Sequence, residues 1–375
     1  MSVLDQIDQP TLLINETAAR ANIAAMTRRA YEKGVAFRPH FKTHQSAQIG
    51  EWFRETGVEK ITVSSVEMAE YFADHGWTDI LIAFSLNPRQ TKRINALARR
   101  IHLSILIENL DVLPPLFLFG QEPLDVWIKV DAGSRRTGLD WQDKKGLHEI
   151  CEAVVRIPRL RLTGLLTHSG HSYHAGSREA VSGVFREGVD RLNKLRDELE
   201  AEGFSGLKVS VGDTPGCSLC EDWSGIDEVR PGNFVLYDAQ QAKEGSCRFE
   251  DIAVALACPV VAKHADRREV VVYGGAIHLS KDYLEVDGKL SYGLPALQRG
   301  QGWGIPIPHA RVDRLSQEHG ILSIPGPEFE QIAVGDLVFI LPAHSCLTVQ
   351  AMGDYLSLNG EKISTFNKKQ SEPIL

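Results

Sequence analysis

A lysine in a basic segment near the N-terminus is the first residue of this chain that could do covalent chemistry. Lys42 lies in the segment RPHFKTH (38–44), directly after a short β-like run. Neighbouring positive charge lowers the pKa of an amine, and an amine that readily loses its proton can form a Schiff base. From this segment alone, a surface lysine is the commoner interpretation.

Two glycine-rich turns have residue types suited to anion binding. They are GDTPG (212–216) and RPGN (230–233), and each ends a β-like run. Glycine exposes backbone N–H groups to an anion, and Thr214 adds a hydroxyl donor. Tight loops that need glycine for backbone reasons alone are the alternative. We interpret the pair as a predicted phosphate site.

Charged and aromatic side chains follow two further β-like runs. Arg136 lies in KVDAGSRRTG (129–138) and offers hydrogen bonds to a cofactor oxygen, with a structural pair between Asp131 and an arginine as the alternative. The segment HSGHSYH (168–174) suggests a metal by its three histidines, but their spacing does not match a rigid helix or strand. We therefore predict that His168 and Tyr173 line a pocket.

A histidine and a cysteine two residues apart follow a β-like run near the C-terminus. In an extended segment, residues i and i+2 point to the same side, so His344 and Cys346 are expected to bind one ion together. Imidazole with thiolate favours zinc over magnesium or manganese. Two ligands are few, and a buried free cysteine is the alternative. We interpret Cys217 and Cys220, a C-x2-C without a second pair, as reduced thiols.

The elements that must position these residues alternate between β-like runs and helical patterns, as in parallel βα units. Asn15 caps one helical pattern, Ser64 and Glu67 have capping-box spacing before another, and a third spans 178–203. Eight alternations favour a (β/α)8 barrel with its active site at the carboxyl ends of the strands, and an open doubly wound sheet is the alternative. The eight β-like runs are 35–38, 60–63, 79–84, 102–107, 124–130, 161–167, 207–212 and 226–230.

After about residue 245 the long helical patterns stop, and Gly and Pro punctuate β-rich runs. We predict a barrel domain over 10–243 and a β-rich, metal-binding domain over 244–375 that includes residues 1–9. We expect 366–375 to fray. The β-rich runs are 252–262, 269–274, 310–315, 337–341 and 355–358.

Composition excludes several classes of protein. The 375 residues carry 41 basic and 49 acidic side chains, a net charge of −8, which argues against a nucleic-acid partner. No apolar run approaches the ~18 residues that span a membrane, and the N-terminus lacks the pattern of a secretory signal. Six cysteines in a chain of this length are typical of reduced thiols. A cytoplasmic protein without membrane partners is therefore expected.

Six motifs occur in order along the chain: RPHFKTH, SSVEMAE, KVDAGSRRTGL, GDTPG, RPGNFVLYD and AHSC. Together they resemble the D-threonine aldolase and D-serine dehydratase family, which has the alanine-racemase-like fold of type III pyridoxal-phosphate enzymes. The resemblance covers roughly 9–365. It implies a (β/α)8 barrel followed by a C-terminal all-β domain, a homodimer, and a small D-amino acid as the substrate.

The resemblance also implies roles for individual residues. Lys42 is similar to the lysine that holds pyridoxal 5'-phosphate, and Arg136 to the arginine near its phenolic oxygen. His344 and Cys346 are similar to a metal pair that is His-x-Cys in zinc-dependent dehydratases and His-x-Asp in aldolases with harder ions. Leu166 stands where the dehydratases have a second tyrosine. The remaining implied cofactor-binding residues are His168, Tyr173, Thr214, Gly232, Asn233 and Tyr237.

The implied activity is loss of water from a D-3-hydroxy amino acid, giving a 2-keto acid and ammonia. Lys42 would take the α-proton, the cofactor would act as electron sink, and the metal would bind the β-oxygen. Aldol cleavage to glycine and an aldehyde uses the same groups and is the main alternative. The others are a racemase, a non-catalytic pyridoxal-phosphate carrier, which resembles a single barrel without the β-domain, and a binding protein that has lost the cofactor.

Overall fold

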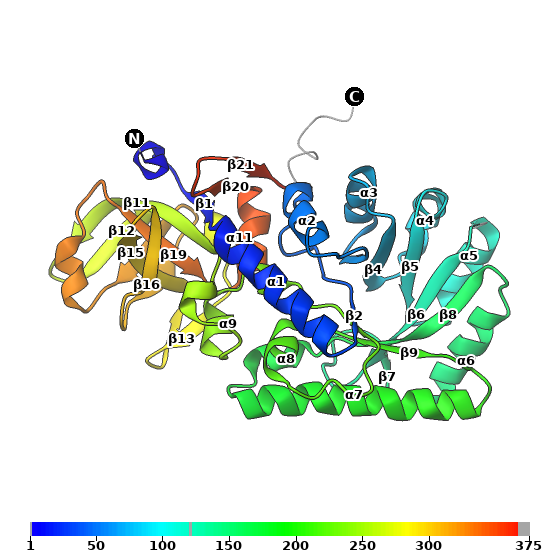
Figure 1. The fold of residues 1–375 in the computed structure, drawn as a ribbon. Helices are drawn as coiled ribbons and strands as arrows, with labels where there is room; N and C mark the ends of the chain where they lie inside the picture. The colour runs from blue at the N-terminus through cyan, green and yellow to red at the C-terminus, as the bar shows by residue number, and fades with distance from the viewer. Residues whose placement is uncertain (1, 120–121, 367–375) are drawn as a thin grey trace. The chain divides into compact units, whose positions relative to one another are not determined.

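The computed structural model describes residues 2–119 and 122–366 (Figure 1). The chain divides into two compact units. The barrel unit comprises 25–42 and 53–232, and the sheet unit comprises 1–24, 43–52 and 233–375. The domain limits predicted from the sequence, 10–243 and 244–375, stay a prediction.

The strands of the barrel unit form a parallel sheet in the order β2-β10-β9-β8-β6-β5-β4-β3, with β7 (Leu139–Asp140) beside β6. His40, just after β2, forms an isolated parallel bridge with Thr62 of β3, and this bridge links the two ends of the order. Each of the eight predicted β-like runs overlaps one of these strands, with β4, β6 and β8 each extending one residue beyond the predicted limits, and the barrel class is confirmed. The bounds are β2 (Ala36–Phe37), β3 (Ile61–Val63), β4 (Asp79–Ser85), β5 (His102–Ile107), β6 (Leu124–Asp131), β8 (Leu160–Leu166), β9 (Lys208–Val211) and β10 (Glu228–Val229).

Helices follow most of these strands, and Figure 1 shows α3, α4 and α5 in succession beside β4, β5 and β6. The third predicted helix is α7, whose buried face includes Val181, Phe185 and Leu192. The cap predicted at Ser64 lies one residue later, because the Ser65 side chain accepts the Met68 N–H. The bounds are α3 (Val66–Asp74), α4 (Thr91–Ala98), α5 (Leu113–Phe119), α6 (Lys144–Val155), α7 (Arg178–Ala201) and α8 (Thr214–Leu219).

The first two helices, α1 (Glu16–Glu32) and α2 (Ala47–Arg54), each include residues of both units. Asn15 precedes α1 and its side chain accepts the Ala18 N–H, as the predicted cap requires. Inside the barrel, Leu166 packs with Leu81, Leu106 and Trp127 in an apolar cluster. The position expected to carry a second tyrosine therefore belongs to the barrel core.

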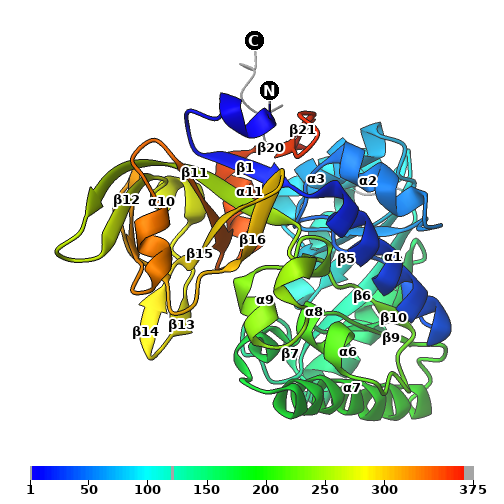
Figure 2. The same cartoon turned by 60° about the vertical axis from the view of Figure 1, so that its left-hand side comes forward.

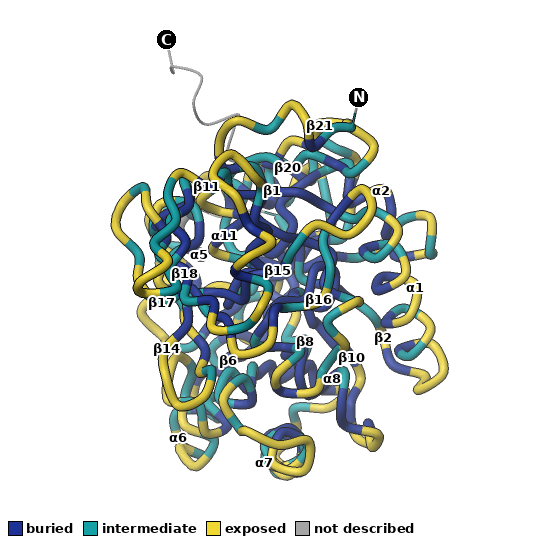
Figure 3. Tube along the Cα trace, turned by 90° about the vertical axis from the view of Figure 1, so that its left-hand side faces the viewer, coloured by how far each residue is buried: buried dark blue, intermediate teal, exposed yellow. Residues whose placement is uncertain are grey.

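The sheet unit has its own sheet, in the order β16-β15-β19-β11-β1-β20-β21, extended by β12, β18 and β17 (Figure 2). β1 and the first half of β11 are buried, whereas β16 and β17 are mostly intermediate or exposed (Figure 3). Each of the predicted β-rich runs overlaps a strand. The bounds are β1 (Thr11–Ile14), β11 (Val254–His264), β12 (Glu269–Tyr273), β15 (Gly293–Arg299), β16 (Gly302–Pro306), β17 (Arg311–Leu315), β18 (His319–Ser323), β19 (Leu337–Pro342), β20 (Asp354–Ser357) and β21 (Lys362–Ser364).

Short elements complete the sheet unit. The hairpin of β13 (Leu284–Val286) and β14 (Lys289–Ser291) stands apart from the large sheet, and the helices are α9 (Ala239–Lys243), α10 (Ala276–Leu279) and α11 (Ser345–Met352). Each of the six cysteines is a free thiol. None of the described helices combines the length and apolar character needed to cross a membrane. The predicted fraying of 366–375 falls almost entirely outside the described residues.

Candidate functional site

Lys42 follows an aromatic anchor. The Phe41 ring is fully buried and lies 5.0 Å from the Phe72 ring and 5.1 Å from the Trp77 ring, centroid to centroid. The Lys42 side chain is exposed, and its backbone N–H donates to Nδ1 of His40 at 3.3 Å. Packing of Phe41 therefore fixes the backbone beyond the carboxyl end of β2, while the side chain of Lys42 stays accessible.

The carboxyl ends of the barrel strands are electropositive. Burial, followed by the charges of Lys42 and Arg230, lowers the pKa of His40 well below its usual value. Burial, followed by Arg136 and Lys42, does the same to the pKa of His168. Both imidazoles are therefore neutral at physiological pH. The structure thus brings Lys42, Arg136 and His168 into one neighbourhood, as the sequence predicts.

Two buried basic residues belong to the same neighbourhood and were missed by the sequence analysis. Burial, followed by the charges of Arg230 and Arg136, lowers the pKa of Lys129 to about 7. Arg230 donates to the Ser210 hydroxyl at 2.8 Å and to the Thr167 carbonyl at 2.6 Å. The signal that could have revealed them is the placement of a charged residue within or directly after a buried strand.

The two glycine turns lie against each other. A Cβ added to Gly212 would lie 2.7 Å from backbone atoms of Arg230, so only glycine permits this approach. His168 contacts the Gly212 carbonyl through Nδ1. The Thr214 N–H donates to the Tyr173 hydroxyl at 3.4 Å. His168, Tyr173 and Thr214 therefore converge on the first turn, and Gly232 lies in the second.

Asp213 holds the first turn in shape. Its carboxylate accepts from the Gly216 N–H at 2.7 Å and from the Ser172 hydroxyl at 2.7 Å. Burial raises the pKa of Asp213 to about 6, although Ser172, Gly216 and the charge of Arg230 lower it. The turn thus contains a carboxyl group that titrates near neutral pH.

The loop that carries Arg136 is shaped by a different carboxylate. Asp131 accepts the backbone N–H groups of Gly133 at 2.8 Å and Arg135 at 3.1 Å. The Arg136 side chain itself is exposed. The Asp131 carboxylate therefore shapes the turn, and the Arg136 guanidinium is left accessible to a ligand.

The histidine and cysteine near the C-terminus lie together, but for a reason other than the one the sequence suggested. Only His344 has extended backbone angles. It is the N-cap of α11, and Cys346 lies in the first turn of that helix. The expectation of an extended segment was wrong, because the helix starts at Ser345. Burial lowers the pKa of His344, but Cys346 and Asp238 raise it, and the result lies well above the usual value.

A buried hydrogen-bond network surrounds this pair within the sheet unit. The Asn233 amide donates to Asp238 Oδ2 at 2.7 Å and to the Ser345 hydroxyl at 2.9 Å. The Asn233 side-chain donors are thus directed into the network. Tyr237 is 9% exposed and has φ +49°, a strained angle for a bulky residue of the kind found at functional sites.

The side chains around Lys42 and around His344 can be compared with what a phosphorylated cofactor and a metal ion would each require. The accessible amine of Lys42 among the charges of Arg136 and Arg230 suits an aldehyde that carries a phosphate. The imidazole of His344 and thiol of Cys346 suit zinc. Among the described residues, no group of three or more His, Cys, Asp or Glu side chains is arranged to hold an ion.

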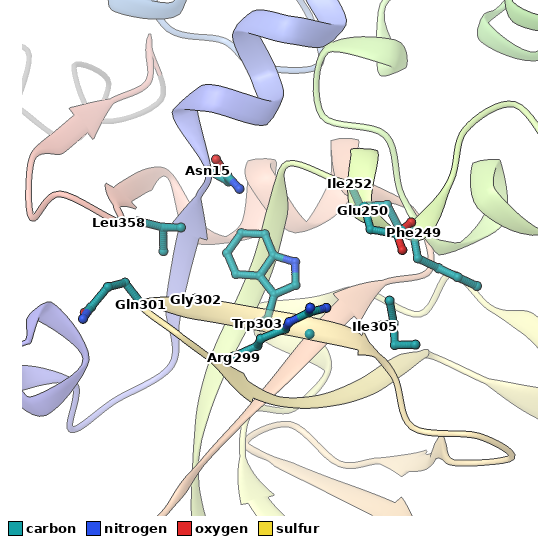
Figure 4. Close-up of a pocket in the computed structure, with 11 residues that line it drawn as sticks. Asn15, Phe249, Glu250, Ile252, Arg299, Gln301, Gly302, Trp303, Ile305 and Leu358 are labelled. Atoms are coloured by element: carbon teal, nitrogen blue, oxygen red, sulfur yellow. The ribbon is translucent and has the colours of Figure 1, made fainter.

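A separate pocket of about 270 Å³ lies in the sheet unit (Figure 4). The Trp303 indole stands near the centre of its labelled side chains, and Asn15, Glu250 and Arg299 contribute polar groups. Its described lining includes none of the predicted site residues.

Comparison with protein families gives two matches. Residues 14–240 match the alanine racemase N-terminal domain, and residues 253–358 match the putative serine dehydratase domain. Among individual proteins, the D-threo-3-hydroxyaspartate dehydratase of Delftia sp. (strain HT23) is 31% identical over 361 residues, covering 94% of each chain. The D-serine dehydratase of Dictyostelium discoideum is 28% identical and covers 96% of this chain and 95% of its own.

An aldolase also matches, and solved structures share the fold. The D-threonine aldolase of Arthrobacter sp is 24% identical, covering 91% of this chain and 86% of its own. The solved Delftia dehydratase has a TM-score of 0.88 at 29% identity, covering 97% of this chain and 98% of its own. A cysteine-to-alanine variant of a D-threo-3-hydroxyaspartate dehydratase, solved in the metal-free form, also has a TM-score of 0.88, at 28% identity over 97% of this chain and 99% of its own.

Proposed function

This chain belongs to the alanine-racemase-like family of D-serine dehydratases and D-threonine aldolases, which are pyridoxal-phosphate-dependent lyases, and we propose that it removes water from D-3-hydroxy amino acids. The observation that carries the proposal is the position of Lys42. It lies beyond the carboxyl end of β2 with an accessible side chain, and after burial its charge is among the causes that lower the pKa values of His40 and His168.

Residues of the barrel unit would hold the cofactor. When bound, pyridoxal phosphate supplies an electron sink for the negative charge that develops at Cα of the substrate. Lys42 would attach it covalently, and the turns at Gly212 and Gly232 would bind its phosphate through backbone N–H groups, helped by the Thr214 hydroxyl. The exposed guanidinium of Arg136 suits the phenolic oxygen. Further contacts are proposed for His168, Tyr173, Asn233 and Tyr237.

Lys42 would also move the proton that starts the reaction. The Lys42 amine would take the proton from Cα of the substrate as general base. Loss of the β-hydroxyl as water would then give an enamine that hydrolyses to a 2-keto acid and ammonia.

His344 and Cys346 would hold a divalent ion, which supplies Lewis acidity toward the β-hydroxyl oxygen. Hydroxide is a poor leaving group, so dehydration benefits from such an ion. Thiolate with imidazole favours zinc. A cysteine-to-alanine variant of a D-threo-3-hydroxyaspartate dehydratase has been solved in a metal-free form, which supports metal binding among the relatives. The zinc-type pair favours dehydration, and the aldolase relative supports aldol cleavage as the alternative.

Product analysis tests the proposal. The purified enzyme would be incubated separately with D-serine, D-threonine and D-threo-3-hydroxyaspartate. Dehydration predicts pyruvate, 2-oxobutyrate and oxaloacetate, respectively, each with one equivalent of ammonia. Glycine together with an aldehyde would show aldol cleavage, and the L-enantiomer would show racemisation. Either of these as the main product would refute dehydration.

Two further properties belong to the proposal. We propose a homodimer, as the resemblance implies, and light scattering would give twice the chain mass of 41.6 kDa. A monomer at assay concentration would contradict it. A cytoplasmic location stays a prediction from the N-terminal sequence and the cysteine content.

A further inference from the structure

We propose that Asp238 is a positioning residue of the metal site: its carboxylate holds Nδ1 of His344, directs Nε2 toward the ion, and supplies a second negative charge beside that of Cys346. This inference rests on the metal site of the proposed function. Its basis is the contacts of one fully buried carboxylate.

Three observations place Asp238 behind His344. Its Oδ2 lies 3.0 Å from Nδ1 of His344. The same oxygen accepts the backbone N–H of Ser345 at 3.0 Å and the amide of Asn233 at 2.7 Å. The other oxygen, Oδ1, accepts the Gln241 N–H at 2.9 Å and so caps α9. Every part of the carboxylate is therefore engaged by a donor, which fixes its orientation.

This geometry determines which nitrogen of His344 is available. A metal-bound histidine commonly donates its other ring N–H to a carboxylate, which fixes the tautomer and raises the basicity of the ligating nitrogen. Because Nδ1 of His344 faces Asp238, we assign Nε2, on the other side of the ring, as the nitrogen that would bind an ion. The bond from Ser345 to the same oxygen also sets where α11 begins, and hence where Cys346 lies relative to His344.

Charge balance supports the same assignment. A fully buried carboxylate is costly unless a cation or several donors compensate it. The basic side chain that meets Asp238 is His344, which must be neutral when it binds a metal. The Asp238 carboxylate and a Cys346 thiolate then carry two negative charges, and a divalent cation neutralises both. Removal of the Asp238 charge should therefore weaken the binding of divalent ions.

The test compares zinc affinity in Asp238→Asn with that of the wild type, with the cofactor bound, by competition with a chromophoric chelator. Asn keeps an oxygen that can cap α9 and removes the charge. We expect the zinc dissociation constant to rise 10- to 100-fold. In the cobalt-substituted variant, the thiolate-to-cobalt absorption should weaken or shift. Affinity within twofold of the wild type together with an unchanged cobalt spectrum would overturn the proposal.

A matched control separates positioning from stability. Asn22 is a buried side chain of the same unit that donates to the Asp251 carbonyl at 2.8 Å. Asn22→Ala should lower the melting temperature without changing zinc affinity. If it weakens zinc binding as much as Asp238→Asn does, the effect is one of general stability and the proposal fails.

A measurement on the wild type covers the case in which Asp238→Asn does not fold. In the zinc-loaded protein with ¹⁵N-labelled histidine, His344, assigned with His344→Gln, should show Nδ1 protonated and Nε2 bound to metal. Zinc on Nδ1 would overturn the proposal. Product identity tests the proposed function separately: an enzyme that cleaves D-threonine to glycine but shows the expected loss of zinc in Asp238→Asn would refute dehydration and support the role of Asp238.

Discussion

The side-chain oxygen of Thr43 lies 3.2 Å from the sulfur of Cys346. Thr43 is the residue after Lys42 in the chain, so a hydroxyl from the lysine motif contacts the predicted metal ligand. Hydrogen bonds to a thiolate are charge-assisted, and such bonds to ligands tune the affinity of a metal site.

Removal of this hydroxyl should weaken metal binding. Thr43→Val keeps the shape of the side chain and loses the donor, and we expect about a tenfold higher zinc dissociation constant, which corresponds to about 1.4 kcal/mol. Chelator competition measures this. Thr43→Ser keeps the hydroxyl and should bind zinc like the wild type. Equal affinities in the valine and serine variants would contradict the role of this hydrogen bond.

Lys42→Ala should abolish the visible absorption band of the lysine-bound cofactor and lower activity by at least the 10²- to 10⁴-fold typical for loss of a general acid–base group. Lys33→Ala is the matched control, because Lys33 is a lysine of the same unit whose amine donates to the Glu221 carbonyl at 2.7 Å. The control should keep both the band and the activity. A band that survives in Lys42→Ala would show that another amine holds the cofactor.

The sequence predicts most of the barrel because parallel strands and their helices leave a local pattern. The run 102–107 coincides with β5, and α7 has the apolar spacing that predicted it. β1 was missed, since Thr11–Ile14 is short and its pairing with β11 and β20 depends on residues more than 200 positions away. A local sequence pattern does not predict which distant strands will pair.

The candidate site was predictable where a motif gives residue type and strand end together, as at Lys42 and Gly212. It was not predictable where the pKa or the contacts of a side chain depend on residues that are distant in the sequence. The low pKa of Lys129 arises from its burial beside Arg230, about 100 residues further along the chain. The contact between Asp238 and His344 joins α9 to α11, and no spacing rule connects the two.

Cys346→Asp should change which ion the site prefers. Carboxylate oxygen is a harder ligand than thiolate, so zinc affinity should fall at least tenfold relative to manganese affinity. Both affinities can be measured by chelator competition on the same preparation. His344→Ala should weaken the binding of both ions. An unchanged ratio of zinc to manganese affinity in Cys346→Asp would remove the thiol from the metal site.

Asp213 predicts a pH dependence of stability. Its pKa is about 6 in the folded protein and about 3.8 in an unfolded chain. Between these values the folded state holds more protons, so this group lowers stability as pH rises from about 4 to 6. The difference of about 2 pKa units between the folded and unfolded states corresponds to about 3 kcal/mol in the free energy of unfolding.

The free energy of unfolding of Asp213→Asn, relative to that of the wild type, should therefore be about 3 kcal/mol higher at pH 7 than at pH 4. Asn also retains an acceptor for the Gly216 N–H, so the cap of α8 is kept. Urea unfolding of the cofactor-free proteins at both pH values measures the difference. A wild type and variant whose stabilities change in parallel with pH would show that this carboxyl titrates at its ordinary value.

Gly212→Ala tests the contact between the two turns. The added Cβ would lie 2.7 Å from the backbone N and C of Arg230, and backbone atoms cannot rotate away as a side chain can. We expect a loss of about 1–3 kcal/mol in stability and weaker cofactor binding, because the turns must separate. Gly183→Ala is the control: it lies exposed in α7 with nothing within 4 Å of the new methyl group and should add about 0.5–1 kcal/mol. Differential calorimetry with a cofactor titration measures both effects. If Gly212→Ala binds cofactor as the wild type does, the close approach of the turns is a packing feature and the phosphate must be bound elsewhere in the barrel.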